Sequence, residues 1–316
     1  MIRIRTGSRL HFGLLSPFAA GRRRFGGIGL MIEHPGIHLE FDSSKDWHVE
    51  GPLAKRVQGL VRELQDPIHL GVLAPLRITI RNAAPEHVGL GTGTQLSLAV
   101  AQGLALSSGN DKLRTPDLAR LTGRGRRSGI GLNGFSQGGL LLDAGKREGT
   151  SAPTLLARME FPEEWAVLLI LPPEEPGRHG EHETAFFAKF VQPKVDVVET
   201  LSALMLRQMV PALMERDFPT FAEAVYLYNR KAGEFYQEMQ GGHYSTPQIA
   251  SIIERLRGMD VKCVGQSSWG PTVFALLASD GEAHLLYEKL SRDPAFANAE
   301  LIVTKGLNQG AKVERA

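Results

Sequence analysis

The stretch PEHVGLGTGTQLSLAVAQGLAL, from Pro85 to Leu106, decides the fold of this chain. Glycines at alternate positions allow a tight turn with exposed backbone amides, and two threonines add hydroxyl groups. An apolar run follows, and the N-terminus of the helix that it predicts favours an anion through its dipole. We therefore predict a phosphate-binding loop, made by Gly89, Gly91, Thr92, Gly93, Thr94 and Gln95.

The loop differs from the two common glycine-rich nucleotide motifs. Gln95 stands where a Walker A loop has lysine, so the loop is not a P-loop. The spacing GxGxG also departs from the dinucleotide fingerprint, and no strand leads directly into Gly89. Because glycines also turn and cap helices without any ligand, a purely structural loop is the alternative.

The composition is that of an ordinary globular protein. The chain has 316 residues, of which 42% are hydrophobic and 22% charged, and a net charge of +2 that argues against a nucleic-acid partner. No apolar run approaches the roughly 18 residues needed to cross a bilayer, and the opening MIRIRTGSRLHFGLL lacks the apolar core of a signal peptide. The single cysteine, Cys263, excludes an internal disulfide framework. We therefore expect a cytoplasmic protein that binds neither membrane nor nucleic acid.

The first half of the chain predicts a sheet covered by helices. Extended runs up to about Val49 predict a twisted sheet, followed by a helix over about 53–65 and a strand over 76–81. The helix over about 94–107 is apolar nearly all round, so we expect it to be buried and to bring the glycine loop to an interior cleft. The run GRGRRSGIGLNGFSQGG, 123–139, predicts loops around the same cleft, because it is too rich in glycine for a regular element.

A second unit is predicted after a change in composition near Arg147. The elements expected there are a strand over 165–171, helices over 195–215, 219–239 and 247–257, strands over 261–265 and 272–278, a helix over 282–291 and a strand over 301–304. This order is typical of an α+β layer. We therefore divide the chain into an N-terminal domain, residues 1–152, and a C-terminal domain, residues 153–316.

Three segments together resemble the GHMP small-molecule kinase superfamily: SRLHFGLL, PEHVGLGTGTQ and VGQSSWGPTVFAL. The resemblance implies a two-domain α+β fold, in which the first domain is similar to the second domain of a ribosomal small-subunit protein and the second is ferredoxin-like. The ligand cleft would lie between them. Several kinases of the superfamily read Ser-Gly-Ile-Asp in a third region, with a catalytic aspartate. Here Gly131 follows Ser128, Gly129 and Ile130, so that carboxylate is missing.

Nearly the full chain resembles one branch of the superfamily, the beta-ribofuranosylaminobenzene 5'-phosphate synthases of methanopterin biosynthesis. The segments that carry this resemblance are RTGSRLHFGLL, FGGIGLMIEHP, LTGRGRRSGIG, PGRHGEHE and GQSSWGPTVFA, together with the glycine loop. It implies a transferase that joins phosphoribosyl pyrophosphate to 4-aminobenzoate, or to 4-hydroxybenzoate, with loss of carbon dioxide and pyrophosphate. It also implies magnesium and a homodimer.

Candidate site residues follow from this chemistry. Arg9 and His11 lie two apart on a predicted strand, so both side chains face the same way, and Arg9 suits the carboxylate of an aromatic acid. His179 could protonate a leaving oxygen, and Glu181 and Glu183 could hold Mg²⁺. Three further residues could contact phosphate, namely Arg124, Ser267 and Ser268, and Trp269 could stack on the aromatic ring. The structural alternatives are an inward polar pair, a solvated charged loop and a tryptophan packed at the domain seam.

Two other functions stay open at this stage. The first is an ATP-dependent GHMP kinase in which another carboxylate replaces the missing aspartate; nucleotide-dependent phosphorylation would support it. The second is a non-catalytic protein that binds a phosphometabolite, which would bind the donor tightly without releasing pyrophosphate. The missing aspartate favours the synthase. Loss of carbon dioxide restores the aromatic ring, so no enzymic base has to remove a ring proton.

Overall fold

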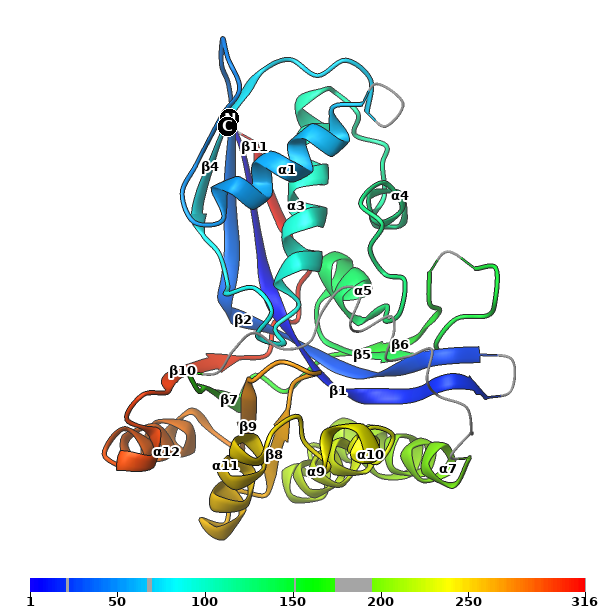
Figure 1. Cartoon of the computed structure of the whole chain (residues 1–316), viewed down its shortest axis with the longest axis vertical. Coiled ribbons are helices and arrows are strands. Elements are labelled where there is room, and N and C mark those ends of the chain that lie inside the picture. Colours follow the sequence, from blue (N-terminus) through cyan, green and yellow to red (C-terminus); the bar gives the residue numbers. More distant parts are fainter. Residues whose placement is uncertain (21–22, 67–69, 151, 174–194, 316) are drawn as a thin grey trace.

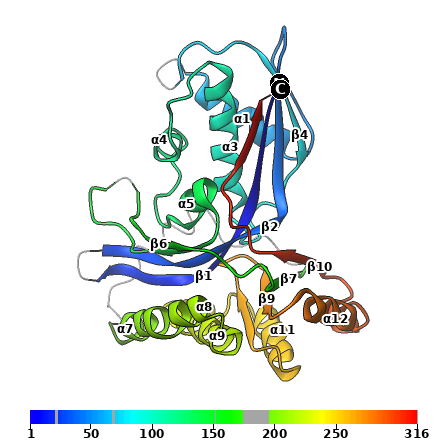
Figure 2. The same ribbon diagram turned by 180° about the vertical axis from the view of Figure 1, so that it is seen from behind.

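The computed structural model describes residues 1–20, 23–66, 70–150, 152–173 and 195–315. Its larger sheet is built on a long hairpin of β1 (Ile2–Ala20) and β2 (Arg23–Ser43). Strand order is β11–β1–β2–β4–β3, and β5 pairs with both β2 and β6. The other strands are β3 (His48–Glu50), β4 (Leu76–Asn82), β5 (Leu140–Asp143), β6 (Leu155–Met159) and β11 (Lys312–Arg315). Figures 1 and 2 show the hairpin running the length of this part of the molecule.

Helices α1 (Ala54–Leu64) and α3 (Thr92–Ser107) cover one face of this sheet, with α4 (Thr115–Leu121) and α5 (Ile130–Gln137) beside them (Figure 1). The prediction that the apolar helix is buried is confirmed, since Leu96, Leu98 and Val100 are fully enclosed. Gly103 allows α3 to approach the sheet closely, because a Cβ there would overlap the ring of Phe41. The position of the glycine loop is therefore set by a rigid, enclosed helix.

The second sheet has the order β10–β7–β9–β8 and is covered on both faces. Its strands are β7 (Ala166–Leu171), β8 (Cys263–Gln266), β9 (Val273–Leu277) and β10 (Glu300–Lys305). In β7, Ala166, Leu168 and Ile170 pack with α11 (Pro247–Gly258) and α12 (Asp280–Ser291), whereas Val167 and Leu169 face the opposite core. This alternation is the two-residue period of a strand buried on both sides.

The opposite core joins the two sheets. It combines Leu10, Phe12 and Leu30 of the long hairpin with α7 (Val195–Leu204) and α9 (Phe218–Gly233). Between these helices lie a π-helical turn (Met205–Met209) and α8 (Val210–Glu215), and Pro211 is the second residue of α8. Strands β6 and β11 both lie beyond residue 152 and yet belong to the larger sheet, so sheet membership does not follow a single cut at 152/153.

One predicted loop is wrong. The glycine-rich run 123–139 contains the helix α5, whose Gly131 and Gly134 allow close packing. A Cβ at Gly134 would overlap Sδ of Met31 on β2, and one at Gly131 would lie 3.3 Å from Thr94 Cγ2 on α3. The glycines thus serve helix packing here, although residues 123–128 do form a loop at the cleft, as predicted.

The second long helix is shorter than predicted, because α9 ends at Gly233 and a short α10 (Gln237–Gln240) follows. Among the described residues, one helical run, Val195–Glu215, has the length and apolar composition to cross a membrane. Its buried residues, including Leu201 and Met209, pack against α9 in the core between the sheets. Core packing accounts for the buried part of this run, whereas Leu206 and Met214 are exposed.

Candidate active site

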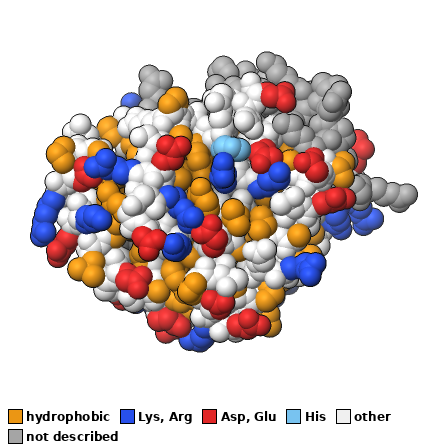
Figure 3. Space-filling view, turned by 90° about the horizontal axis from the view of Figure 1, so that it is seen from below, with side chains coloured by type: hydrophobic (Ala, Val, Ile, Leu, Met, Phe, Trp, Pro, Cys, Tyr) orange, Lys and Arg blue, Asp and Glu red, His pale blue; other side chains and the backbone are white. Residues whose placement is uncertain are grey.

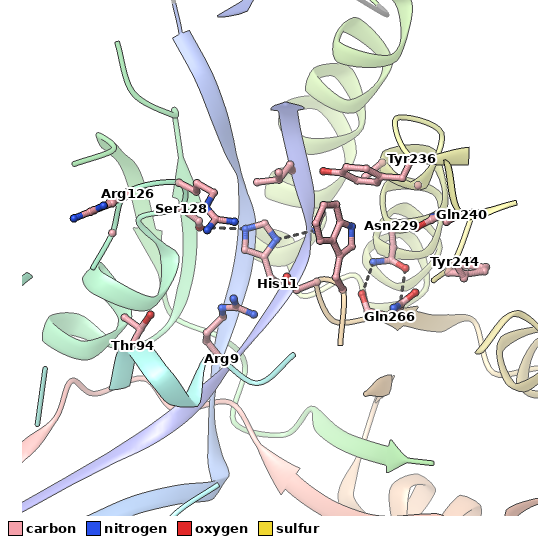
Figure 4. Close-up of a pocket in the computed structure, with 18 of the residues that line it drawn as sticks. Arg9, His11, Thr94, Arg126, Ser128, Asn229, Tyr236, Gln240, Tyr244 and Gln266 are labelled. Atoms are coloured by element: carbon pink, nitrogen blue, oxygen red, sulfur yellow. Dashed lines mark hydrogen bonds between the residues drawn. The ribbon is translucent and has the colours of Figure 1, made fainter. Parts of the chain in front are cut away.

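A pocket opens where the two sheets meet, and it has two chemically different sides. One side carries arginines from β1 and from the loop before α5: Arg9, Arg124, Arg126 and Arg127, together with Thr94 and Ser128. The other side carries aromatic and amide side chains from α9, α10, β8 and the turns that follow α9, α10 and β8: Asn229, Tyr236, Gln240, Tyr244, Gln266 and Trp269. Figure 4 shows His11 and Arg9 between the two sides.

The charge of the described pocket lining is strongly positive. It contains four arginines, and none of the described lining residues is aspartate or glutamate. Arg124 lies partly buried, with Nε donating to Ser97 Oγ at 3.1 Å, and burial, followed by the nearby Arg56, lowers the pKa of its guanidinium. Such a lining binds a ligand that carries several negative charges.

The glycine loop is fixed to the pocket through one carbonyl. Gly89 O accepts hydrogen bonds from Arg9 Nη1 at 2.9 Å and from Ser267 Oγ at 2.8 Å. Gly91 begins α3 in the left-handed region, with φ of 73°, and a Cβ there would lie 2.6 Å from Arg9 Cγ. Gly93 lies beside the Arg124 guanidinium. Gly89 and Gly91 are therefore required by close approach and by backbone conformation, whereas a Cβ at Gly93 would make only an ordinary contact with Arg124.

Three predicted phosphate contacts are engaged elsewhere. Thr92 Oγ1 donates to Pro85 O at 2.6 Å. The Gln95 side chain is fully buried, and both of its polar atoms are engaged. Its Oε1 accepts from Thr6 at 2.7 Å and its Nε2 donates to Gly131 O at 2.7 Å. Ser267 is also buried and accepts from His11 N at 3.1 Å. These side chains hold segments together behind the pocket and do not line it, whereas Thr94, Arg124 and Ser268 do.

Arg9 and His11 both line the pocket, as the strand spacing predicts. His11 is 3% exposed, and burial, followed by the Arg9 charge, lowers the pKa of its ring to about 3. Its Nε2 lies 3.1 Å from Ser128 Oγ, and its Nδ1 accepts from Gly13 N–H at 3.2 Å. Figure 4 shows the His11 ring pointing toward Ser128. The ring is neutral at physiological pH.

A carboxylate that the sequence analysis did not single out lies behind this wall. Asp143, at the end of β5, is 1% exposed and accepts from Gly129 N–H at 2.6 Å and Gly145 N–H at 2.8 Å. Burial raises the pKa of this carboxyl to about 6, although hydrogen bonds from Gly129, Gly145 and Ser128 act in the opposite direction. Its signal in the sequence is one acidic residue closing the apolar run LLLD.

The amide side of the pocket is also held by a buried residue that the sequence analysis missed. Asn229 Nδ2 donates to Phe12 O at 2.7 Å and to Gln266 O at 2.9 Å, and its Oδ1 accepts from Gln266 N. Trp269 packs edge-on against Tyr236, with ring centroids 5.0 Å apart. A lone asparagine on the buried face of α9 was the available signal.

The predicted residues His179, Glu181 and Glu183 lie outside the described residues. Within the described chain, no group of three or more histidine, cysteine, aspartate or glutamate side chains could hold a metal ion. The nominated pair, Glu181 and Glu183, is not among these described residues, so Mg²⁺ stays a prediction.

Two family models match this chain. The model described as the GHMP kinases N terminal domain matches residues 53–138, and the model described as GHMP kinases C terminal matches residues 209–295. These ranges hold the glycine loop with α3 and the helix α9 with the turn at Trp269.

Curated relatives align over nearly the whole chain. The beta-ribofuranosylphenol 5'-phosphate synthase of Methanothermobacter thermautotrophicus is 31% identical, over 98% of this chain and 97% of the relative. The protein of the same name from Archaeoglobus fulgidus is also 31% identical, over 99% of this chain and 100% of the relative.

Solved structures share the fold over the whole length. A putative homoserine kinase from Listeria monocytogenes has a TM-score of 0.69 at 17% identity, and 100% of each chain is covered. Mevalonate diphosphate decarboxylase from Staphylococcus aureus has a TM-score of 0.64 at 13% identity, with 100% of this chain and 99% of the other covered. At these identities the likeness concerns the fold alone, and it confirms the predicted GHMP-type α+β fold.

Proposed function

Because the chain belongs to the family of GHMP-type beta-ribofuranosylphenol 5'-phosphate synthases, we propose that it joins phosphoribosyl pyrophosphate to an aromatic acid. The acceptor is 4-aminobenzoate or 4-hydroxybenzoate, and the product is a carbon-linked riboside 5'-phosphate on the path to tetrahydromethanopterin. The observation that carries this proposal is the two-sided pocket, with arginines on one side and aromatic and amide groups on the other.

The donor fits the arginine side. Phosphoribosyl pyrophosphate carries a 5'-phosphate and a pyrophosphate, and guanidinium groups bind such oxygens with paired N–H donors. Arg124, Arg126 and Arg127 come from one loop, opposite Thr94 at the start of α3. Hydrogen-bond donors placed at the leaving pyrophosphate stabilise the charge that develops there.

The acceptor fits the aromatic side, with its carboxylate toward Arg9. Trp269 and Tyr236 offer ring faces and edges for an aromatic ring, and Arg9 lies between this side and the donor side. The bond from Arg9 Nη1 to Gly89 O fixes the guanidinium at this position, between the two sides.

The reaction needs no base for a ring proton. The bond from the anomeric carbon to pyrophosphate breaks, and the ring carbon that carries the carboxylate forms the new carbon–carbon bond. The bond to the carboxylate then breaks, carbon dioxide leaves, and its electron pair restores the aromatic ring. The position at which GHMP kinases have aspartate is Gly131 here, packed against Thr94 and Gln95. A synthase has no need of that carboxylate.

Magnesium is part of this proposal. It would neutralise pyrophosphate charge when bound, and Glu181 and Glu183 remain the nominated ligands. We expect chelation with EDTA to abolish turnover and added Mg²⁺ to restore it, measured as pyrophosphate release. Full activity in excess EDTA would remove magnesium from the mechanism.

We also propose a homodimer that uses the C-terminal helices. Hydrophobic side chains lie among acidic and basic ones on the face that these helices present (Figure 3). Leu206 is 54% exposed and Met214 is 74% exposed, about two turns apart on the helical run Val195–Glu215. Light scattering of the wild type and of a Leu206→Glu, Met214→Glu variant tests this surface, and a monomeric wild type would refute it.

The test of the function is a radiochemical assay without ATP. Purified protein is incubated with phosphoribosyl pyrophosphate, Mg²⁺ and carboxyl-labelled 4-aminobenzoate or 4-hydroxybenzoate. We expect labelled carbon dioxide in equal amount to pyrophosphate, and the better acceptor identifies the substrate. If both ligands bind and no carbon dioxide appears, the synthase proposal fails; ATP consumption with a small alcohol would then favour a kinase.

A further inference from the structure

The hydrogen bonds of His11 fix where its hydrogen lies. The Gly13 backbone N–H can only donate, so His11 Nδ1 is an acceptor, at 3.2 Å. A neutral ring with an acceptor Nδ1 carries its hydrogen on Nε2, and this N–H points at Ser128 Oγ, 3.1 Å away.

The His11 bond also determines the direction of the bond between Ser128 and Asp143. Ser128 Oγ accepts from His11 and also from Ile130 N–H at 3.2 Å, so both of its lone pairs are engaged. Its own hydrogen is left for Asp143, with which it forms a hydrogen bond. The chain therefore runs from His11 Nε2–H to the Ser128 hydroxyl and on to the Asp143 carboxylate.

This series of hydrogen bonds reaches the pocket wall at His11, where the sign of the local charge affects the reaction. The described pocket lining has four arginines and no carboxylate, yet departure of pyrophosphate leaves positive charge on the ribose. A protonated His11 would add another cation at that wall. A neutral His11, linked through Ser128 to an ionised carboxylate, instead brings negative charge toward the same region.

We propose that Asp143 is a positioning residue for catalysis, which acts through Ser128 to orient the His11 ring and to bring its negative charge toward the cationic sugar of the transition state. This role rests on the proposed synthase function. Asp143 does not line the pocket, so it influences turnover through the other two residues rather than by touching substrate.

The relay predicts an acid limb in the pH profile. Asp143 faces Ser128 and the Gly129 and Gly145 amides, and the nearby titratable or charged groups are Arg23, His11 and Tyr228. Since burial raises the pKa of Asp143 to about 6, its carboxylate becomes protonated as the pH falls through that value, and kcat should fall with it. The pKa of His11, about 3, lies too low to cause this limb.

The experiment compares Asp143→Asn and Ser128→Ala with a matched control, Asp293→Asn. Asp293, which follows α12, also accepts a backbone N–H, from Ala295 at 3.0 Å, and it does not line the pocket. We expect each relay variant to lose roughly 10- to 100-fold in kcat with little change in KM, and Asp143→Asn to lose the acid limb. The control should retain wild-type kcat and its acid limb.

A second readout does not depend on turnover. Nitrogen-15 NMR of labelled histidine distinguishes a protonated Nε2 from a protonated Nδ1 in the folded protein. We expect Nε2–H at His11 in the wild type, and the same tautomer in Ser128→Ala because the Gly13 N–H still bonds to Nδ1, but with the Nε2 resonance shifted by loss of its bond to Ser128. This variant leaves the two backbone bonds of Asp143 in place. Nδ1–H in the wild type, or unchanged kcat and acid limb in Asp143→Asn, would overturn the proposal. If the wild-type protein releases no carbon dioxide, the synthase function alone is refuted. The NMR result still tests the hydrogen bond from His11 to Ser128 independently of turnover.

Discussion

Arg126 is the exposed member of the four pocket arginines, so its contribution to donor binding can be measured without disturbing the fold. We expect Arg126→Gln to raise KM for phosphoribosyl pyrophosphate about tenfold, since one charge-assisted contact is worth about 1.5–3 kcal/mol before solvent screening reduces it. Steady-state kinetics at low and high salt check this. Arg120→Gln is the control, because Arg120 is an exposed arginine on α4 that pairs with Asp117 and does not line the pocket. Equal KM values for both variants would contradict the assigned phosphate side.

His11 also makes a prediction about stability. Its pKa is about 3 in the folded chain and 6.5 in the unfolded chain, so the unfolded chain binds the extra proton between these values. Its contribution to stability is therefore present above pH 6.5 and is lost as the pH falls toward 3. Between pH 7 and pH 5 this loss is about 2 kcal/mol, and His11→Gln should remove it.

Urea unfolding at both pH values measures this difference. The raised pKa of Asp143 acts in the opposite direction, because the folded chain there takes up the proton first as the pH falls. The variant should therefore gain stability on acidification relative to the wild type. His284→Gln, at an exposed position on α12, should follow the wild type. Identical pH dependence in His11→Gln and the wild type would contradict a neutral buried ring.

Whether the role of a single polar residue could be predicted from the sequence depended on its hydrogen-bond partners in the folded chain. The two-residue period of a strand was enough to place Arg9 and His11 in one pocket. Gln95 and Ser267 belong to motifs that suggest phosphate, yet their side chains bond to Thr6, Gly131 and Gly89 instead. Those partners are distant in sequence, and nothing local reveals that a buried hydroxyl or amide is already engaged.

At the scale of elements, α5 tests whether its glycines serve packing. We expect Gly134→Ala to destabilise the protein by about 1–3 kcal/mol, because the new methyl group would overlap Met31 Sδ. The matched control is Gly59→Ala in α1, where nothing lies within 4 Å of the new Cβ. There we expect a gain of about 0.5–1 kcal/mol from helix propensity. Thermal unfolding of both variants measures the contrast, and a stabilised Gly134→Ala would contradict the close packing of α5 on β2.

The same contrast explains which elements the sequence could predict. The helix α3 was predictable because its apolar residues occupy every face, and the strands β7 and β9 because their apolar runs are short and bounded by turn residues. The glycines of α5 read as turn formers, although tertiary packing uses them as small residues. Local propensity cannot distinguish the two uses, since the deciding atom, Met31 Sδ, lies about a hundred residues away in the chain.

At the scale of the whole molecule, one core joins the two sheets, and the pocket draws residues from both. We therefore expect a single unfolding transition that phosphoribosyl pyrophosphate shifts as a unit. A ligand at 100 times its Kd adds about 2.7 kcal/mol to the free energy of unfolding. Calorimetry with and without the donor checks this. Two transitions, of which only one shifts, would contradict the shared core.

Long-range sheet pairing was the part of the architecture that sequence patterns could not give. The boundary predicted at 152/153 follows a change in composition, but β6 and β11 lie beyond it and complete the larger sheet. Each is short, and pairing with β5 or β1 is decided by the assembled fold rather than by its own residues. The resemblance to GHMP proteins supplied the two-domain arrangement that periodicity alone left open.

The position of β11 has a consequence for how the protein is made. Arg315 pairs with Ile2, so β1 gains its outer neighbour only after Lys312–Arg315 has left the ribosome. Figure 1 shows residues from both ends of the sequence meeting at one tip of the molecule. Until β11 has emerged, the edge of β1 offers unpaired amides and carbonyls to other nascent chains. Ribosomes stalled just before Lys312 should therefore carry an aggregation-prone product, and a synthetic peptide of the last strand supplied in trans should protect it.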